Sequence, residues 1–124
     1  MNTLHVLLID DEEAFVTTLQ ERLELRGVEA RVALDGAAGL GMLEEKQPDA
    51  VVLDLRMPGL SGVEVLKRIR HGWPELPVIM LSGHGSDQDF RTCLDLGAAM
   101  YHKKPLDLDV LLDSLHQVVR LNGR

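Results

Sequence analysis

The sequence is poor in aromatic residues, cysteine and long apolar runs, and each shortage excludes a class of protein. Aromatic residues make up 3% of the 124 residues, too few for the stacking platforms that bind single-stranded nucleic acids. The single cysteine, Cys93, cannot form a disulfide within the chain, which favours a reducing compartment. No apolar run approaches the roughly 18–20 residues that cross a bilayer, and the first residues lack the basic leader of a signal peptide. We therefore expect a cytoplasmic protein that does not enter a membrane.

Positive charge is also scarce. Lysine and arginine number 13 against 20 aspartates and glutamates, so the net charge is −7 and the pI is about 5.1. Such a chain offers no basic surface for phosphate backbones, and we expect no direct binding to nucleic acid or anionic membranes. Apolar residues at 45% and charged residues at 27% are typical of a globular domain. The length predicts one domain spanning residues 1–124.

Short apolar runs alternate along the chain with longer segments of helical period. The runs HVLLI, AVVL and VIML are almost continuously apolar, as strands are when both faces of a parallel sheet are covered. We predict strands over residues 4–9, 29–33, 50–53, 78–81 and 99–102. We predict helices between them, over residues 12–26, 37–46, 62–71, 86–97 and 107–121.

The first helix illustrates the pattern. Phe15, Leu19 and Leu23 recur at four-residue spacing and predict a buried stripe, and Gly27 then suits a left-handed C-terminal cap. A βα unit repeated five times is too short for an eight-unit barrel, so an open, doubly wound parallel sheet is expected. In such sheets ligands bind beyond the carboxyl ends of the strands.

Polar residues follow the predicted strands at that edge. They are Asp10 and Asp11 with Glu12 after the first strand, Asp54 after the third, Ser82 after the fourth, and Lys103, Lys104 and Pro105 after the fifth. A single aspartate here is equally well explained as a solvated strand end. The whole set is not, because solvation does not require acid, hydroxyl and lysine at successive strand ends. Clustered carboxylates suit Mg²⁺ and raise one another's pKa without a cation among them.

The motifs IDDE (9–12), LDLRMPGLSG (53–62), LSGHG (81–85) and GAAMYHKKP (97–105) resemble those of the receiver domains of two-component response regulators, of the chemotaxis-regulator kind. The resemblance covers essentially the whole chain. It implies a flavodoxin-like α/β sandwich, (βα)5, with parallel strands in the order 2-1-3-4-5. That order makes the first and third strands neighbours and so brings their aspartates together.

The resemblance implies that Asp54 is the phosphoacceptor, whose carboxylate attacks a phosphohistidine and becomes an aspartyl phosphate. It implies a bound Mg²⁺ with Asp11 as a direct ligand and Asp10 as a ligand through water. The Asp54 carboxylate and the backbone carbonyl of Arg56 complete the implied protein ligands. The metal would neutralise charge that develops on the phosphoryl oxygens.

The resemblance also implies the residues that respond to phosphorylation. Lys104, which directly precedes Pro105, pairs with the phosphoryl group, whereas Lys103 is expected to face solvent. The Ser82 hydroxyl turns to the new phosphoryl oxygen, and Tyr101 moves inward with it. Arg56 and His84 occupy positions that flank the phosphoryl group and tune hydrolysis. A solvent-facing side chain explains Arg56 equally well, and a loop role is favoured for His84.

A switch that phosphorylates and dephosphorylates only itself is therefore expected, and not a turnover enzyme. Its expected partners are a sensor histidine kinase or histidine phosphotransfer protein, and an output domain or target protein. Contact or homodimerisation is expected through the helix near 86–97, the strand near 99–102 and the helix near 107–121. Whether the domain acts alone or within a longer regulator stays open.

Two alternatives from other classes fit the sequence less well. A Mg²⁺-dependent phosphatase or phosphotransferase of the haloacid-dehalogenase type has a DxDxT-like motif after its first strand, but here that strand ends in DDEEA. A flavin-binding module needs a phosphate loop at the same place, where the acids at positions 10–13 would repel a phosphate.

Overall fold

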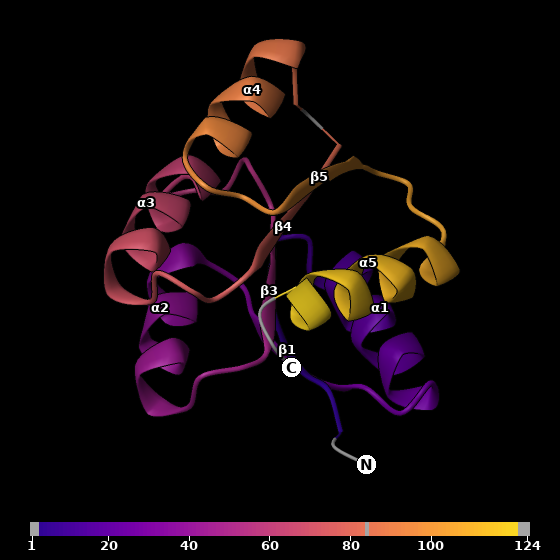
Figure 1. The fold of residues 1–124 in the computed structure, drawn as a ribbon. Coiled ribbons are helices and arrows are strands. Elements are labelled where there is room, and N and C mark those ends of the chain that lie inside the picture. Colours follow the sequence, from indigo (N-terminus) through magenta and orange to yellow (C-terminus); the bar gives the residue numbers. More distant parts are fainter. Residues whose placement is uncertain (1–2, 84, 122–124) are drawn as a thin grey trace.

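A parallel β-sheet with helices on both faces forms the protein (Figure 1). The computed structural model describes residues 3–83 and 85–121. The strands are β1 His5–Ile9, β2 Glu29–Ala33, β3 Ala50–Leu53, β4 Val78–Ser82 and β5 Met100–Lys103. The helices are α1 Glu13–Leu25, α2 Gly36–Glu45, α3 Gly62–Gly72, α4 Asp87–Asp95 and α5 Leu108–Leu121. The strand order is β2-β1-β3-β4-β5 and all pairs are parallel, which confirms the predicted fold.

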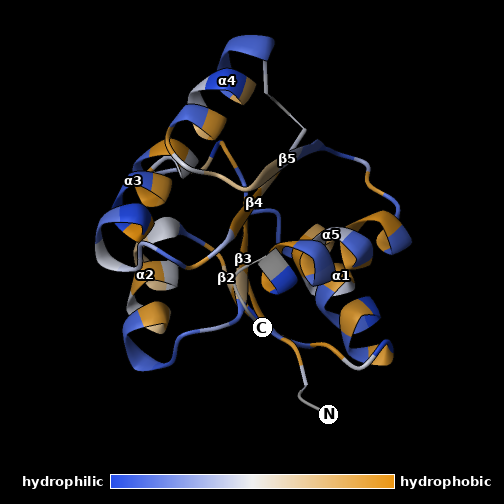
Figure 2. Ribbon diagram, viewed as in Figure 1, coloured by the Kyte–Doolittle hydropathy of each residue, from blue (hydrophilic) through white to orange (hydrophobic). Residues whose placement is uncertain are grey.

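Side chains that alternate along the strands form one core on each face of the sheet. In β1, Leu7 and Ile9 pack under α2, α3 and α4, whereas Val6 and Leu8 pack under α1 and α5. Successive residues of a strand point to opposite faces, so both must be apolar when both faces are covered. Figure 2 shows the result, with the apolar sides of the helices turned toward the sheet and polar residues outside.

Helix ends lie where the sequence provides caps. Ser61 accepts a hydrogen bond from the Glu64 amide at the start of α3, and Ser86 and Asp89 form a capping box at the start of α4. Gly27 and Gly97 follow the ends of α1 and α4 with φ of 82° and 102°. Both lie in the left-handed region that favours glycine at helix C-termini.

The buried stripe of α1 differs in part from the prediction. Leu23 is fully buried, but Phe15 and Leu19 are only half-buried, and Val16 is the second buried residue of the helix. Positions 16 and 23 are seven residues apart and share one helical face, which packs on the sheet. Phe15 and Leu19 instead face a cavity of about 440 Å³ between α1 and α5.

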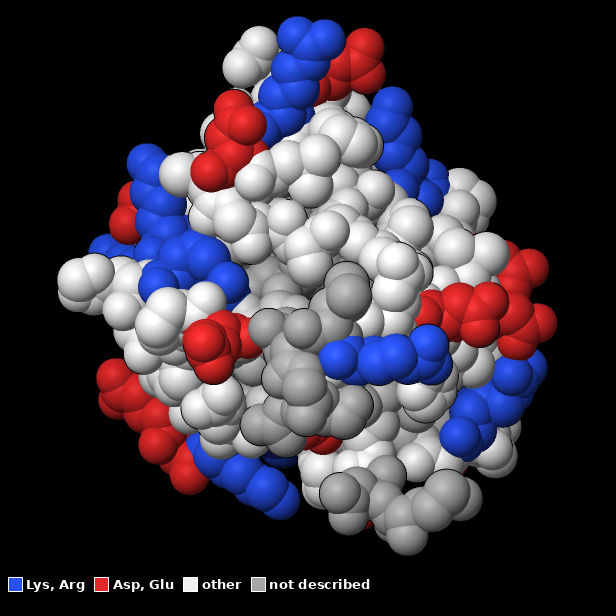
Figure 3. All heavy atoms as spheres, viewed as in Figure 1, with Lys and Arg blue, Asp and Glu red and all other residues white. Residues whose placement is uncertain are grey.

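The surface carries no concentration of one charge sign on the face seen in Figure 3, where Lys and Arg side chains are interspersed with Asp and Glu. Within residues 3–83 and 85–121, no helix combines the length and the apolar character that a membrane span needs.

Candidate functional site

The pairing of β1 with β3 brings Asp10 and Asp54 to one edge of the sheet. Ile9 and Leu53 are register partners, and the Asp54 amide donates to the Ile9 carbonyl oxygen at 2.9 Å. Each aspartate is the first residue beyond its strand. Asp10 is 5% exposed and Asp54 2%, which is rare for carboxylates without a compensating partner.

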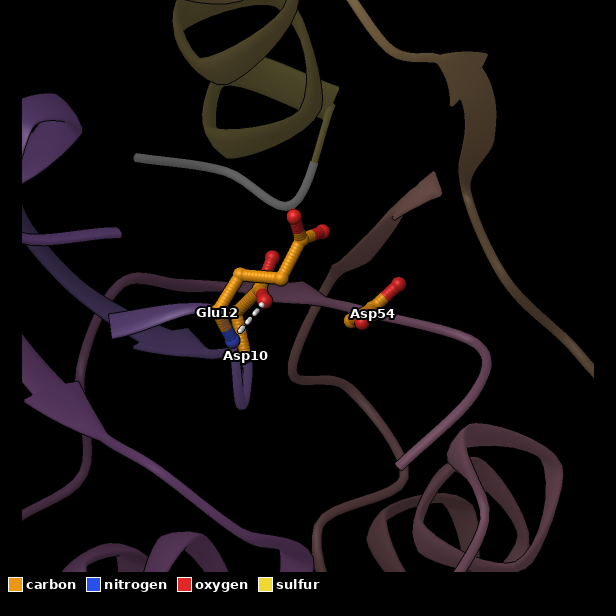
Figure 4. A group of neighbouring side chains, drawn as sticks. All are labelled: Asp10, Glu12 and Asp54. Carbon is orange, nitrogen blue, oxygen red and sulfur yellow. Dashed lines mark hydrogen bonds between the residues drawn. The ribbon is translucent and has the colours of Figure 1, made fainter. Parts of the chain in front are cut away.

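Three carboxylates meet at this edge. Oxygen atoms of Asp10, Glu12 and Asp54 all lie within 4.8 Å of one another (Figure 4). The Asp10 carboxylate accepts a hydrogen bond from the Glu12 amide at 2.8 Å, which turns the chain so that the Glu12 side chain points back to the site. Among the described residues, exposed Asp11 is not part of this group.

The site is electrostatically unfavourable for its own acids. Burial raises the pKa of Asp10 above its ordinary value, although Lys104 and the Glu12 amide act in the opposite direction. Burial also raises the pKa of Asp54, and the neighbouring charge of Asp10 raises it further. Both effects disfavour the ionised carboxylates, so the pocket favours a bound cation.

Lys104 supplies one positive charge. Its ammonium lies 2.8 Å from the Asp10 carboxylate and 2.6 Å from that of Glu12, and its side chain is 10% exposed. Burial alone would lower the pKa of Lys104, but the hydrogen bonds to Asp10 and Glu12 outweigh it and the pKa is raised. The preceding residue, Lys103, is exposed.

Short local contacts fix the Asp54 carboxylate. One oxygen accepts the Leu55 amide at 2.9 Å, and the Ser82 hydroxyl also hydrogen-bonds this side chain. The loop after Asp54 turns at Gly59, with φ of 77°, and returns so that the Gly62 amide donates to the Leu55 carbonyl oxygen at 2.7 Å. The carboxylate is therefore held in one orientation.

Tyr101 of β5 points into the molecule beside the site. It is 7% exposed, its ring packs on Phe90 of α4 with centroids 5.4 Å apart, and its hydroxyl oxygen comes close to Gly85. Within the described residues, that hydroxyl is buried without a hydrogen-bond partner. Burial is the main cause that raises the pKa of Tyr101.

Arg56 extends away from the acids. Its side chain is 64% exposed, and its guanidinium lies 3.7 Å from the Asp89 carboxylate on α4. His84, the other residue expected beside the phosphoryl group, lies outside the described residues.

Glu12 receives no role from the sequence or from the resemblance. In the sequence, Glu12 is marked by its place as the third consecutive acid of IDDE. The direction of its side chain toward the pocket depends on a turn in which the Asp10 carboxylate accepts the Glu12 amide. Apart from Asp11, Arg56 and His84, the predicted side chains Asp10, Asp54, Ser82, Tyr101 and Lys104 lie in or beside the pocket.

The donor set suits a hard divalent ion. Three carboxylate oxygens within 4.8 Å of one another, compensated within the described residues by the single ammonium of Lys104, offer the oxygen ligands that Mg²⁺ prefers. This acidic cluster is typical of a Mg²⁺-binding site.

Comparison with known proteins identifies relatives over nearly the whole chain. The family model for the response regulator receiver domain matches residues 6–116. The uncharacterized transcriptional regulatory protein YkoG of Bacillus subtilis is 39% identical over 119 residues, which are 96% of this chain and 52% of that protein. The transcriptional regulatory protein KdpE of Mycobacterium tuberculosis is 41% identical over 117 residues, 94% of this chain and 51% of that protein.

Solved structures agree on the fold. A response regulator receiver domain from Clostridium thermocellum has a TM-score of 0.92 at 30% identity, covering 97% of both chains. A CheY-like receiver domain from Methanospirillum hungatei has a TM-score of 0.93 at 24% identity, covering 98% of both chains. The chain spans about half the length of the curated relatives it matches.

Proposed function

The chain belongs to the response regulator receiver domains of two-component signalling, regulatory phosphoacceptors and not classical enzymes, and we propose that Asp54 is the residue that takes the phosphoryl group. The observation that carries this proposal is the position of its carboxylate. It is buried at the end of a central strand, oriented by Leu55 and Ser82, and adjacent to both Asp10 and Lys104.

The proposed transfer starts from a phosphohistidine on a partner protein. The Asp54 oxygen that is free to attack forms a bond to phosphorus as the phosphorus–nitrogen bond breaks, and the electron pair of that bond stays on the imidazole. A proton from water then neutralises the released ring. The product carries roughly −1.5 to −2 charges beside Asp10, where the ionised Asp54 carboxylate carried −1, so it persists only with positive charge nearby.

For that reason we propose a Mg²⁺ site on the same residues. Asp10, Asp11, Asp54 and the backbone carbonyl of Arg56 are the proposed protein ligands, Asp10 through water. When bound, the ion would neutralise charge on the carboxylate and phosphoryl oxygens. Asp11 is exposed, whereas Glu12 lies with the other acids, so variants at both positions distinguish the direct ligand.

Three further side chains have proposed roles in the response. Lys104 moves its ammonium from Glu12 to the phosphoryl oxygens, and the Ser82 hydroxyl exchanges the Asp54 carboxylate for a phosphoryl oxygen. Tyr101 follows the movement of Ser82. Arg56 and His84 tune hydrolysis of the aspartyl phosphate, and the contact of Arg56 with Asp89 connects that position to α4.

The proposed partners follow from the same chemistry. A sensor histidine kinase or a histidine phosphotransfer protein supplies the phosphoryl group, and an output domain or target protein responds to it. We propose that the surface formed by α4, β5 and α5 makes this contact and is also the surface for a homodimer. The names of the relatives as transcriptional regulators support output at the level of transcription. We also propose residues 1–124 as one receiver domain and the cytoplasm as its location, in keeping with the free thiol of Cys93.

The experiment is direct phosphorylation followed by intact mass. We expect the protein, incubated with acetyl phosphate and Mg²⁺, to gain the mass of one phosphoryl group. Asp54→Asn should gain none, and chelation of the metal by EDTA should prevent the gain in the wild type. Asp11→Asn and Glu12→Gln, compared side by side, identify the acid that the metal requires. Modification of Asp54→Asn at the wild-type rate would overturn the proposal.

A further inference from the structure

The ammonium group of Lys104 is enclosed by two carboxylates and an aromatic ring. Besides its contacts with Asp10 and Glu12, its nitrogen lies 4.2 Å from the centroid of the Phe15 ring, over the ring face. An ammonium group has three N–H donors. The carboxylates account for two directions, and the ring covers a further side.

The Phe15 ring is half-buried, between the core and the α1–α5 cavity. Phe15 lies in the first turn of α1 and packs against the core between that helix and α5. The same ring lines the α1–α5 cavity together with Leu19, Leu81 and Pro105. Pro105 directly follows Lys104, so the segment that carries the ammonium and the ring that covers it line one cavity.

The physical effect of the ring depends on how little water reaches the ammonium. A cation over an aromatic face is attracted by the negative potential of that face, and the attraction increases when the cation is desolvated. The Lys104 side chain is 10% exposed, so the ring acts on a poorly hydrated charge. A leucine at position 15 would fill much of the space but would present no negative face.

Glu12 shows why a second restraint matters. Its side chain is 54% exposed, so an ammonium held by carboxylates alone can follow Glu12 outward into water. The flexible four-carbon stem of lysine offers little resistance to that movement. The ring opposes it, because an ammonium that leaves for water gives up the attraction of the ring face.

We infer that Phe15 is a positioning residue of the phosphoryl site, which holds the Lys104 ammonium within reach of Asp54. This inference rests on the proposed role of Lys104 as the partner of the phosphoryl group. It assigns the start of α1 a part in the chemistry, in addition to its packing.

The test compares side chains of similar size at position 15. Phe15→Leu removes the aromatic face, Phe15→Tyr keeps it, and phenylalanines carrying one, two or three ring fluorines weaken it stepwise with little change of shape. Two quantities are measured: the NMR shifts of the Lys104 ε-methylene protons, which the ring current displaces, and the dissociation constant of beryllofluoride with Mg²⁺, a mimic of the bound phosphoryl group.

We expect Phe15→Leu to return the Lys104 shifts to those of a free lysine and to weaken beryllofluoride about threefold. Phe15→Tyr should keep the Lys104 shifts and the beryllofluoride affinity at their wild-type values. The fluorinated series should weaken beryllofluoride binding progressively as the number of fluorines increases. Leu19→Ala is the matched control. It removes apolar contact from the same face of α1 one turn later, and should lower thermal stability but leave both readouts unchanged.

Each contrary outcome has a distinct meaning. Beryllofluoride affinity that is equal in Phe15→Leu and wild type, or independent of fluorination, overturns the positioning role. If Phe15→Leu does not fold, the fluorinated series alone decides. Failure of wild type to bind beryllofluoride, while the Lys104 shifts still respond to Phe15→Leu, contradicts the proposed phosphoryl site and not the contact between ring and lysine.

Discussion

The two halves of the pocket differ in how firmly they are built. On one side, Asp10 and Asp54 extend from β1 and β3, whose residues from Val6 to Ile9 and from Ala50 to Leu53 are all buried. On the other side, α4 buries only Cys93 and leaves Phe90 39% and Leu94 38% exposed. We call these the acidic half and the α4–β5 half.

Hydrogen bonding shows the same contrast. In the acidic half, the carboxylates of Asp10 and Asp54 accept from backbone amides at 2.8 and 2.9 Å. In the α4–β5 half, the buried Tyr101 hydroxyl has no partner among the described residues, a cost that the native structure bears. The difference suggests a division of work, in which firm backbone places the reacting groups and the looser half supplies the movement.

The strongest test of the acidic half is a methyl group at Gly62. A Cβ there would overlap the backbone carbonyl oxygen of Asp54 and lie 2.7 Å from the Leu55 Cα. Because backbone atoms of a buried strand end cannot move aside cheaply, we expect Gly62→Ala to lower the free energy of unfolding by about 3 kcal/mol. Urea unfolding followed by circular dichroism measures the change.

Gly41 provides the control, since a Cβ there meets no atom within 4 Å and the residue lies inside α2. Gly41→Ala should stabilise the protein by up to about 1 kcal/mol. A loss under about 1 kcal/mol for Gly62→Ala would show that the loop after Asp54 yields, and that the acidic half is less firm than described.

The glycines of α2 show which features of the fold could be predicted from the sequence and which could not. Apolar runs and caps were sufficient for the strands and for most helix ends, because those depend on local pattern. The strand order instead followed from the resemblance to receiver domains. In the sequence, the glycines at 39 and 41 weaken the helix predicted over residues 37–46, and Gly36 lies just outside it. In the structure a Cβ at Gly36 would meet Val65, and a Cβ at Gly39 would meet Ile9, each at 2.5 Å. Such close approach of a helix to its neighbours leaves no periodic signal.

The residues of the site also divide into those that could be predicted from the sequence and those that could not. Asp54 and Ser82 were found because each follows an apolar run directly. Lys104 was distinguished from Lys103 by the resemblance, through the Lys-Pro pair that it forms with Pro105. Glu12 was expected at this edge of the sheet but without a role, and Phe15 was expected only in the core. Their contacts in the pocket depend on a turn closed by the Asp10 side chain and on the rotation of α1 about its axis. Contacts that depend on side-chain direction across two elements are not visible in residue spacing.

A smaller effect is expected when the charge of Asp54 is removed without changing its shape. Burial raises the pKa of Asp54, so the ionised carboxylate destabilises the native state at neutral pH. In wild type this cost disappears as the pH falls through the raised pKa, because the native state then binds the proton before the unfolded chain does. Asp54→Asn, in EDTA, should therefore be more stable than wild type at pH 7.

The difference between the two proteins should shrink as the pH approaches 3.8, the ordinary value for an aspartate. Urea midpoints measured at several pH values test this dependence. Equal stability of Asp54→Asn and wild type at pH 7 would mean that solvent or Lys104 already compensates the charge, and that the acidic half carries no electrostatic strain for a metal to relieve.

The smallest change in stability, and the clearest test of the α4–β5 half, is expected for Gly85→Ala. A Cβ there would overlap the Tyr101 hydroxyl oxygen, which is the free end of a side chain and not backbone. Tyr101 can turn outward and in doing so hydrates its unpaired hydroxyl, so the free energy of unfolding should change by under about 0.5 kcal/mol.

The chain has a single tyrosine, and 3-fluorotyrosine therefore gives one ¹⁹F signal that reports its position. We expect that signal to move toward the solvent-exposed shift, and the raised pKa of Tyr101 to fall toward its ordinary value. A large loss of stability with an unmoved signal would show that this half is as rigid as the acidic one.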